Sequence, residues 1–310
     1  MLLWRQQEHR AAYISSRDTE GSIVSSYCHF MPEPHPSIVP IIQEARFSGV
    51  AKLRHLKFDH SLVTALVERW RPETHTFHFP TGECTITLQD VSLQLGLPVD
   101  GPPIIGPTML DWDEMCETLL GIIPVNGESI VGSMIKLKWL GDNLFPIDEN
   151  SSIEVIHAHA RAYILGLIGG VLMPDKTRNK IHLICPLLHQ FQEFHQLSPL
   201  VCQWSGGRVL NYRNVPHNDL VGYRARIDHM QQNQFIWVPY EGFGSIIDVE
   251  AYRDQAIWTS CTTLICFAIV EWHQSDMVKL QFRLSQEIHE EPNNLDHLHK
   301  LDMRVRQDKN

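Results

Sequence analysis

One run of basic, aromatic and polar side chains carries the strongest chemical signal in the sequence. It comprises Arg69, Trp70, Arg71, Glu73 and His75. An indole ring can stack on a nucleobase while guanidinium groups neutralise phosphates, so a run of this kind could bind nucleic acid. The same groups could instead make cation–π contacts and pair with neighbouring carboxylates to fix the local fold. These five residues are the candidate interaction site.

Further aromatic and basic residues stand together at 212–213 and 223–226. The overall charge of the chain limits how far such runs indicate nucleic-acid binding. The 310 residues include 26 Lys and Arg against 36 Asp and Glu, a net charge of −10 with His neutral. This balance excludes a generally basic surface that grips phosphate backbones. Nucleic-acid contact would have to be local, and it is not favoured over contact with protein.

Eighteen histidines raise the question of a metal site, because imidazole is a common metal ligand. His75 and His78 lie on a predicted strand, where an odd separation sends them to opposite faces. His157 and His159 lie two apart on a predicted helix, roughly 200 degrees apart around its axis. No two cysteines have the spacing of a metal site. The sequence therefore predicts no metal ion and no other cofactor.

The sequence also lacks the signatures of common catalytic sites. Its seven cysteines form no C-x-x-C pair and are odd in number, which indicates reduced thiols. Residues 205–207 lack the G-x-S-x-G elbow of a serine nucleophile, and the glycines of 166–170 lack the Lys-Ser/Thr of a phosphate loop. Glu271 and Asp276 near His273 are interpreted as solvated loop charges. We assign no catalytic residue and expect a protein that is not an enzyme.

The composition is that of a folded globular protein, with 43% hydrophobic and 20% charged residues. The longest apolar stretches, at 163–173 and 264–270, are shorter than the roughly 18–20 residues that cross a bilayer. The apolar start of the chain is interrupted at Arg5, so no signal-peptide core forms. We expect neither secretion nor a membrane anchor.

Apolar periodicity and capping residues predict a mainly helical chain. The predicted helices cover residues 37–45, 61–70, 87–95, 111–121, 152–172, 181–201 and 276–284. Residues 152–172 are the best candidate for a central helix, and Gly166, Gly169 and Gly170 would permit close approach or a break within it. On the helix of 61–70, the apolar face is expected to include Leu62 and Leu66.

A smaller β component accompanies these helices. Residues 74–79 and 84–88 alternate around the turn Thr81-Gly82, which predicts a β-hairpin in the N-terminal half. Short strands are predicted at 235–238 and 264–272 from their β-branched and aromatic content. The predicted fold is α+β and mainly α, with an irregular lead-in at 1–36, one domain at 37–284 and a polar tail at 285–310.

A family resemblance is carried by the segment from Leu62 to Gly101. It contains Val-Glu-Arg-Trp-Arg-Pro-Glu-Thr-His-Thr-Phe at 67–77 and Leu-Gln-Asp-Val-Ser-Leu-Gln-Leu-Gly-Leu-Pro-Val-Asp-Gly at 88–101. These forty residues resemble the plant mobile domain, also called the aminotransferase-like plant mobile domain, of MAINTENANCE OF MERISTEMS proteins and long-form relatives of protein phosphatase 7. Further agreement occurs at 161–176, 235–240 and 264–273, so the resemblance covers about residues 47–305.

One departure from the family lies between residues 186–188 and Tyr223. Family members carry a longer helical stretch there, whereas this chain has only the short segment around 203–208. The sequence therefore resembles a plant mobile domain that is shortened internally around 189–222.

The resemblance implies a role rather than a reaction. It implies a nuclear protein that acts in transposon silencing, genome integrity and meristem development, within a complex that includes a phosphatase-like partner. Our leading hypothesis is a non-enzymatic module that binds protein partners. The alternative is a transposon-derived nucleic-acid-binding domain that uses Arg69, Trp70 and Arg71. A pyridoxal-phosphate enzyme, with Lys176 as the Schiff-base lysine, is the least favoured hypothesis.

Overall fold

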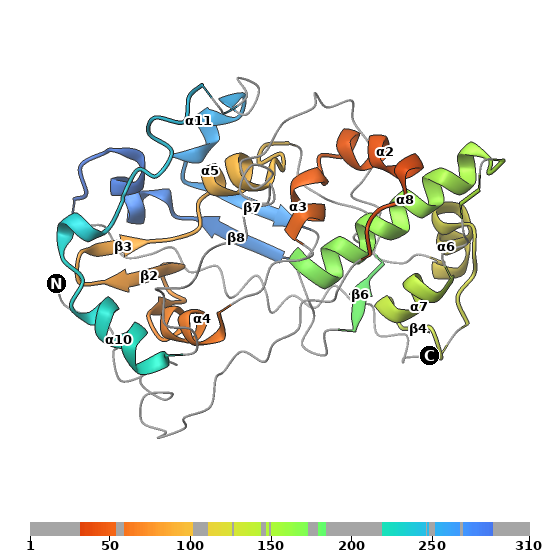
Figure 1. Cartoon of the computed structure of the whole chain (residues 1–310), viewed down its shortest axis with the longest axis horizontal. Helices are drawn as coiled ribbons and strands as arrows, with labels where there is room; N and C mark the ends of the chain where they lie inside the picture. Colours follow the sequence, from red (N-terminus) through yellow and green to blue (C-terminus); the bar gives the residue numbers. More distant parts are fainter. Residues whose placement is uncertain are drawn as a thin grey trace, which may run out of the picture.

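Helices and short antiparallel sheets build the protein, which confirms the predicted α+β class (Figure 1). The computed structural model describes residues 32–53, 59–101, 111–125, 127–143, 147–148, 150–172, 179–183, 219–245, 247, 252–266 and 269–287. The predicted lead-in at 1–36 and tail at 285–310 lie mostly outside these residues. The domain boundaries therefore stay a prediction.

Lobe A is built around the largest cluster of buried apolar side chains. Its elements are η1 (Pro36–Ile38), α2 (Val39–Glu44), α3 (Ser48–Leu53), α6 (Trp112–Leu120), β4 (Ile130–Val131), β5 (Met134–Lys136), α7 (Leu137–Asn143), α8 (Ile153–Leu167), the π-helical turn η3 (Ile168–Leu172) and β6 (Lys180–His182). Helix α8 is the predicted central helix. Its second half, from His159 onward, is almost entirely buried. The other helices of lobe A pack around it.

Lobe B holds two smaller apolar clusters. Its elements are α4 (His60–Val67), β1 (Trp70–Arg71), β2 (Thr76–Phe79), β3 (Gly82–Cys84), α5 (Leu88–Asp90), η2 (Val91–Leu95), α10 (Leu220–Asp228), η6 (Gln232–Gln234), α11 (Gln255–Trp258), β7 (Thr262–Cys266), β8 (Ile269–His273) and η8 (Ser275–Phe282). Strands β1, β2 and β3 form one antiparallel sheet, and β7 pairs with β8 in another.

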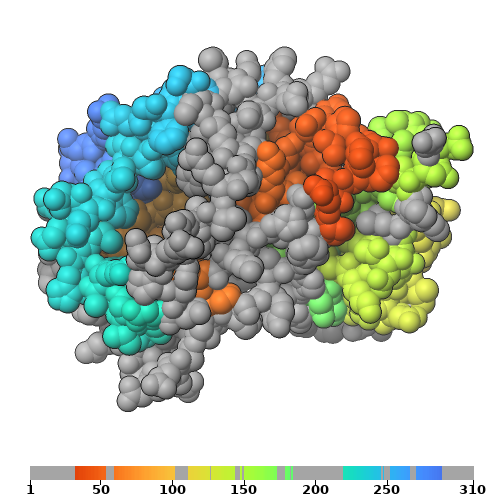
Figure 2. Space-filling view, in the orientation of Figure 1, coloured from red at the N-terminus to blue at the C-terminus, as the bar shows by residue number. Residues whose placement is uncertain are grey.

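The chain alternates between the two lobes. Residues 36–53 build lobe A, 60–96 build lobe B, 112–183 return to lobe A and 219–284 complete lobe B. Leu95 of η2 and the following Leu97 pack against the lobe A cluster and so join the two lobes. In Figure 1 the elements of lobe A lie to the right and those of lobe B to the left, and Figure 2 shows α10 and the α6–α8 region at opposite ends of the molecule. Each lobe is therefore assembled from two segments that are distant in the sequence.

Local capping chemistry explains several of the predicted helix boundaries. Thr87 and Asp90 form a capping box, in which the Thr87 hydroxyl accepts the Asp90 N–H and the Asp90 carboxylate accepts the Thr87 N–H. Asp111 caps α6 with its own side chain, which accepts from the backbone N–H groups of Asp113 and Glu114. Gly96 and Gly121 end their helices with φ near +71°, the left-handed conformation that glycine adopts without strain.

The predicted hairpin is present as β2 and β3, joined at the predicted turn. Gly82 pairs with Phe79 and has φ of +143°, and a Cβ atom there would lie 2.9 Å from the indole of Trp237. Only glycine therefore suits this corner. The second strand differs from its prediction at 84–88, because β3 covers Gly82–Cys84, residues 85–87 are irregular and Leu88 begins α5. Strand β1 adds a third strand that the sequence pattern did not indicate.

Three other predictions about secondary structure need correction. Residues 181–182 belong to β6 rather than to a helix, because Ile181 pairs with Ile135 of β5, and most of the predicted helix at 181–201 lies outside the described residues. Residues 235–238 are irregular rather than a strand. The strand predicted at 264–272 is two strands, β7 and β8. Only the strand at 181–182 depends on pairing with a distant segment, β5, which a local pattern does not contain.

Helix α4 also differs from its prediction. It ends at Val67, so Arg69 and Trp70 lie beyond it, and its buried side chains are those of Ser61, Thr64 and Ala65. Leu62, which we expected on the buried face, is 37% exposed.

The segment Ile153–Leu172 is long and apolar enough to cross a membrane by length and composition, contrary to our expectation from the shorter apolar stretch within it. However, 61% of its most apolar window is buried inside the protein. Burial of this kind is what the central helix of a packed lobe requires, so the finding is weak evidence for a membrane span.

Gly169 provides a test of lobe A. A Cβ atom at this position would lie 2.7 Å from Cβ of Ile181 and 3.1 Å from the side chain of Leu137, so the glycine permits the predicted close approach of α8 and η3 to the sheet. We expect Gly169→Ala to lower the free energy of unfolding by roughly 1–3 kcal/mol through overpacking. Urea denaturation measures the change.

Gly141 supplies the matched control. It lies within α7 and has no atom within 4 Å of the position of a Cβ. Gly141→Ala should leave stability unchanged or raise it by about 0.5–1 kcal/mol, because alanine is the better helix former. Equal stability of the Gly169→Ala variant and the wild type would contradict the close approach.

Candidate functional site

The structure places Arg69 between two helices rather than on an open surface. Its Nη1 donates to the carbonyl oxygen of Ala65 at 3.0 Å, and its Nη2 donates to the carbonyl oxygen of Arg224 at 3.5 Å and pairs with the carboxylate of Asp228. Only 14% of the side chain is exposed. Arg69 therefore joins the end of α4 to α10 and has little guanidinium surface left for a ligand.

Two more polar contacts join the same helices. Arg224 of α10 donates through Nε and Nη2 to both carboxylate oxygens of Glu68, whose side chain is only 9% exposed. Tyr223 donates its hydroxyl to Oδ2 of Asp59 at 2.6 Å, while Oδ1 of Asp59 caps the N-terminus of α4. Burial, followed by the hydrogen bond to Asp59, raises the pKa of Tyr223 to about 12, so the hydroxyl keeps its proton. The hydrogen bonds to Glu68 raise the pKa of Arg224 further above its ordinary value.

We call these polar contacts the α4–α10 clasp. Its members share one property, a side chain that links α4 or its ends to α10, and they are Asp59, Glu68, Arg69, Tyr223, Arg224 and Asp228. Ala65, Tyr223 and Ile227 supply the buried apolar contact between the helices. Arg69, Tyr223 and Arg224, which belong to the basic and aromatic runs of the sequence, are therefore used in a contact within the protein.

Trp70, Arg71 and Glu73 belong to the edge of the first sheet of lobe B. The indole of Trp70 meets the ring of Phe77 edge to face, with centroids 4.8 Å apart. Arg71 is 9% exposed, and its Nη1 lies 3.8 Å from Oε1 of Glu73. The pairing of Arg71 with Glu73 agrees with the structural interpretation of the run, in which carboxylates fix the entry to the hairpin.

His75 is the most exposed member of the candidate site. It adopts φ of +53° in the turn before β2, a left-handed conformation that is uncommon for residues other than glycine, and Thr85 holds the turn by donating its hydroxyl to the His75 carbonyl oxygen at 2.6 Å. Its Nε2 lies 3.7 Å from Oε2 of Glu271 on β8, and the two side chains are 44% and 43% exposed. The structure thus brings His75 together with Glu271, which we interpreted as a loop charge.

A buried polar group lies behind this turn. Thr76 donates to the carboxylate of Glu83 at 3.0 Å, and Nε2 of His78 lies 3.1 Å from the same carboxylate oxygen. The Glu83 side chain is 5% exposed. Buried carboxylates need such partners, and these contacts fix strand β2 against β3. His75 and His78 have different partners, but His75 lies in the turn before β2 rather than on the strand, so the prediction that both lie on one strand is wrong.

His273, at the end of β8, contacts the backbone just before β7 rather than Glu271. Its Nδ1 lies 2.9 Å from the carbonyl oxygen of Ser260, and burial lowers its pKa below the ordinary value. Nearby, the thiol of Cys261 lies 3.3 Å from Oδ1 of Asp276. Of the two carboxylates that the sequence placed near His273, Asp276 is close enough for its charge to act on the imidazole, whereas Glu271 faces His75.

The described residues contain no group of three His, Cys, Asp or Glu side chains that could hold a metal ion. His157 is exposed and His159 is buried, in line with their predicted separation around the helix. Burial raises the pKa of Cys84 to about 12 and that of Cys116 to about 11, so both thiols stay protonated and are poor nucleophiles. Lys176 and residues 205–207 and 212–213 lie outside the described part of the chain.

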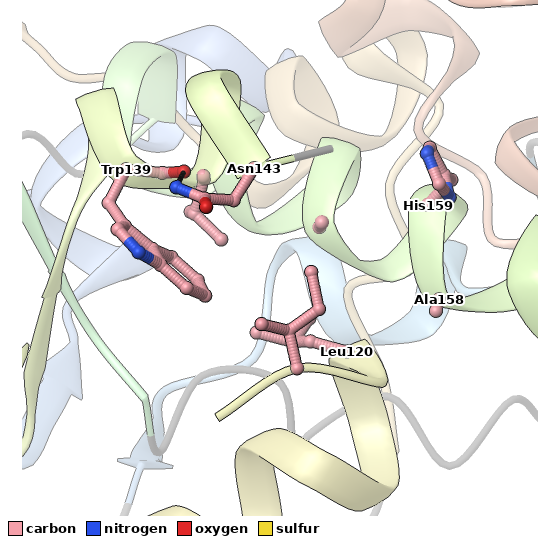
Figure 3. A pocket seen from close by; sticks show the side chains of 8 residues that line it. Leu120, Trp139, Asn143, Ala158 and His159 are labelled. Atoms are coloured by element: carbon pink, nitrogen blue, oxygen red, sulfur yellow. Dashed lines mark hydrogen bonds between the residues drawn. The ribbon is translucent and has the colours of Figure 1, made fainter. Parts of the chain in front are cut away.

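A shallow hollow opens between α6, α7 and α8 of lobe A (Figure 3). The enclosed part of the hollow is only about 20 Å³, which is room for about one water molecule, and the rest is open to solvent. The side chains that line it are mostly apolar, and they are Leu120, Ile122, Trp139, Leu140, Asn143, Ala158, His159 and Ala162. His159 is the one titratable residue among them, and its Nδ1 lies 2.9 Å from the carbonyl oxygen of Val155. The lining of the hollow is therefore mostly apolar.

The arrangement agrees with a comparison to known protein families. The model of the plant mobile domain matches residues 46–198 and 186–310. The chain belongs to the plant mobile domain family. This confirms the resemblance that residues 62–101 indicated. No solved structure matches the chain.

Curated relatives from Arabidopsis thaliana agree with this assignment. The chain is 31% identical to a Serine/threonine-protein phosphatase 7 long form homolog over 98% of the chain and 28% of the relative. It is 30% identical to Protein MAINTENANCE OF MERISTEMS over 93% of the chain and 71% of that protein. Identity to Protein MAIN-LIKE 1 is also 30%, over 81% of the chain and 59% of the relative. The chain thus spans between 28% and 71% of the length of these relatives.

The internal shortening around 189–222 stays a prediction. The family model matches in two parts that meet and overlap at residues 186–198. The alignment to the phosphatase 7 long form homolog extends over 374 residues, more than the 310 of the chain, so that relative carries residues without a counterpart here. The break in the family match falls where the chain passes from lobe A to lobe B, between β6 and α10. Elements of both lobes are therefore kept on either side of the break.

The α4–α10 clasp predicts the effect of removing one cation. Arg224→Ala leaves the mostly buried Glu68 carboxylate without its bidentate partner, so we expect the free energy of unfolding to fall by roughly 1–3 kcal/mol. Arg226 is the matched control, because it lies two residues further along α10 and is exposed. Arg226→Ala should change stability by less than about 0.5 kcal/mol. Equal losses in urea denaturation for the two variants would contradict the clasp.

Proposed function

We propose that this chain is a non-enzymatic nuclear protein-interaction module that acts in transposon silencing, genome integrity and meristem maintenance. The observation that carries the proposal is the 30% identity to Protein MAINTENANCE OF MERISTEMS, which extends over 93% of the chain and 71% of that protein. A relationship of this extent covers both lobes, so the relative and this chain have most of a domain in common. The proposed role in the meristem follows from the name of that relative.

Contacts at the candidate interaction site support a protein partner over nucleic acid. Arg69 and Arg71 are largely buried, and each guanidinium pairs with a carboxylate that reaches the surface, Asp228 at 59% and Glu73 at 37% exposed. The side chains of the turn that reach solvent are Glu73 and His75, and Glu271 of β8 lies beside His75; all three are between 37% and 44% exposed. A surface with an exposed carboxylate repels a phosphate backbone, whereas it can accept hydrogen bonds from a protein partner.

A phosphatase-like protein is the partner class that we propose. One curated relative carries the name of a protein phosphatase 7 long form homolog, and this chain aligns with 28% of its length. A protein of that name therefore contains a plant mobile domain together with further sequence. In that relative, the plant mobile domain is part of a chain named after a phosphatase. We therefore propose that the domain of this chain binds a separate phosphatase-like protein.

The proposal is tested in a plant line that lacks the chain. We expect transposon transcripts to rise and meristems to fail, and a fluorescent fusion of the wild-type chain to enter the nucleus and restore both. The double variant His75→Ala/Glu271→Ala should fail to restore them, because it removes the exposed pair of the turn. Asp100→Ala, at an exposed residue outside this turn, should restore them as the wild type does.

Two outcomes would contradict this proposal. The first is unchanged transposon transcripts in the line that lacks the chain. The second is tight binding of the purified chain to duplex DNA with the steep salt dependence of phosphate contacts. A loss of that binding in Arg69→Ala or Arg71→Ala would support the nucleic-acid alternative in its place.

A further inference from the structure

The sheet of β7 and β8 has fewer strands than the other sheets of the described residues. Those two sheets each have three strands, whereas β7 pairs with β8 alone. A sheet of two strands is marginally stable in water, and further strands stabilise it. Figure 1 shows β7 and β8 side by side, and β8 is the strand that contacts the hairpin, through Glu271 and His75 at 3.7 Å. The edge along β7 is therefore the place where a further strand can pair.

The backbone of β7 has groups left over for such pairing. In an antiparallel pair, only alternate N–H and C=O groups of a strand point to its neighbour. The pairing of β7 with β8 runs without a bulge from Thr262, opposite His273, to Cys266, opposite Ile269. Within the described part of the chain, β7 has no second strand and no other backbone hydrogen bond. An unpaired row of this kind is a template for another strand.

The side chains of β7 leave this edge apolar and unprotected. Leu264 is 38% exposed and Ile265 is 37% exposed. Successive residues of a strand point to opposite faces of the sheet, so apolar surface is exposed on both faces. Proteins protect an exposed edge with charged residues, proline or a bulge, yet residues 255–270 contain no Asp, Glu, Lys, Arg or Pro. The edge therefore has the features of a strand that is covered by another.

The charge of the protein favours a second copy of the chain as the occupant. The net charge is −10, so two copies repel each other where their acidic surfaces meet. The uncharged segment around β7 lets them approach without like charges opposite each other. Antiparallel pairing of β7 with itself, about a two-fold axis at Leu264, places Leu264 opposite its own copy and Thr263 opposite Ile265. Both are pairs of side chains that suit neighbouring strands, since β-branched and aliphatic residues pack well there.

We propose that β7 is the interface of a homodimer, in which the two copies join their two-stranded sheets into one antiparallel sheet of four strands. A two-fold interface uses the same edge of both copies, so assembly stops at the dimer. The five residues of β7 bury little surface by themselves, so the dissociation constant should lie at roughly 10–100 μM. The dimer goes beyond the proposed function and requires no nuclear partner.

Sedimentation velocity of the purified chain, from about 1 to about 300 μM, tests the dimer. We expect Leu264→Lys/Ile265→Lys to raise the dissociation constant about ten-fold or more, because lysines on an edge strand oppose pairing and would face one another across the axis. Val221→Lys/Ile236→Lys is the matched control. It adds the same charge at two apolar residues that are each 74% exposed outside this sheet, and it should change the dissociation constant by less than about two-fold.

Disulfide crosslinking tests the pairing without adding charge to the edge. The variant is Leu264→Cys in a Cys261→Ser background, since Cys261 is exposed and would react itself. Mild oxidation should give a disulfide-linked dimer, because the two residues at the axis face each other across the strands. Val221→Cys in the same background should stay monomeric under the same oxidation.

Three outcomes would overturn the homodimer. One is a monomer at every concentration together with no crosslink through residue 264. Another is a dimer whose dissociation constant is the same for the Leu264→Lys/Ile265→Lys variant and the wild type, because that dimer would use a different surface. The third is growth of the wild type beyond two copies, which a two-fold edge does not allow. These measurements use the isolated protein, so their failure is distinct from failure of the proposed function in the plant.

Discussion

The contact between α4 and α10 is the interaction on which the rest of lobe B depends. The two helices come from segments far apart in the chain, and the ion pair between Arg224 and Glu68 joins residues 156 positions apart. Glu68 and Arg69 are mostly buried, so each needs the partner that the other helix supplies, because a buried charge without one is costly. The apolar contact of Ala65 with Ile227 adds burial at the same place. Without α10, the first half of lobe B would expose the apolar patch, and Glu68 and Arg69 would keep only the contact of 4.0 Å with each other.

This constraint also says what a shortened chain of this family would have to keep. The break in the family match lies on the path from β6 to α10, after lobe A is complete and before lobe B is closed. Residues on such a path can differ in length at a small entropic cost, since the cost of closing a loop grows slowly with its length. What must be kept is the pairing of β6 with β5 on one side and the α4–α10 clasp on the other. The chain keeps both.

Local chemistry made much of the fold predictable from the sequence. The caps of Thr87 and Asp111, the turn at Gly82 and the close approach at Gly169 depend on neighbouring residues or on a missing side chain, so the sequence alone indicated them. Strand β1 and the strand at Ile181 depend on partners elsewhere in the chain, and a periodic pattern does not contain them. The candidate site shows the same division. The sequence identified Arg69 and Arg71 as chemically capable residues, but it could not show that the partner of Arg69 is Asp228 or that Glu271 lies beside His75.

Hydrogen exchange of the intact chain tests the central claim most directly. If the clasp closes lobe B, the backbone amides of α4 and α10 are protected together, and mild denaturant raises their exchange rates in parallel as one cooperative unit. Arg224→Ala should then speed exchange in both helices while amides in the buried half of α8 stay protected. Fast exchange throughout α10 beside protected amides in α4 would show that the two helices do not support one another, and it would contradict the account.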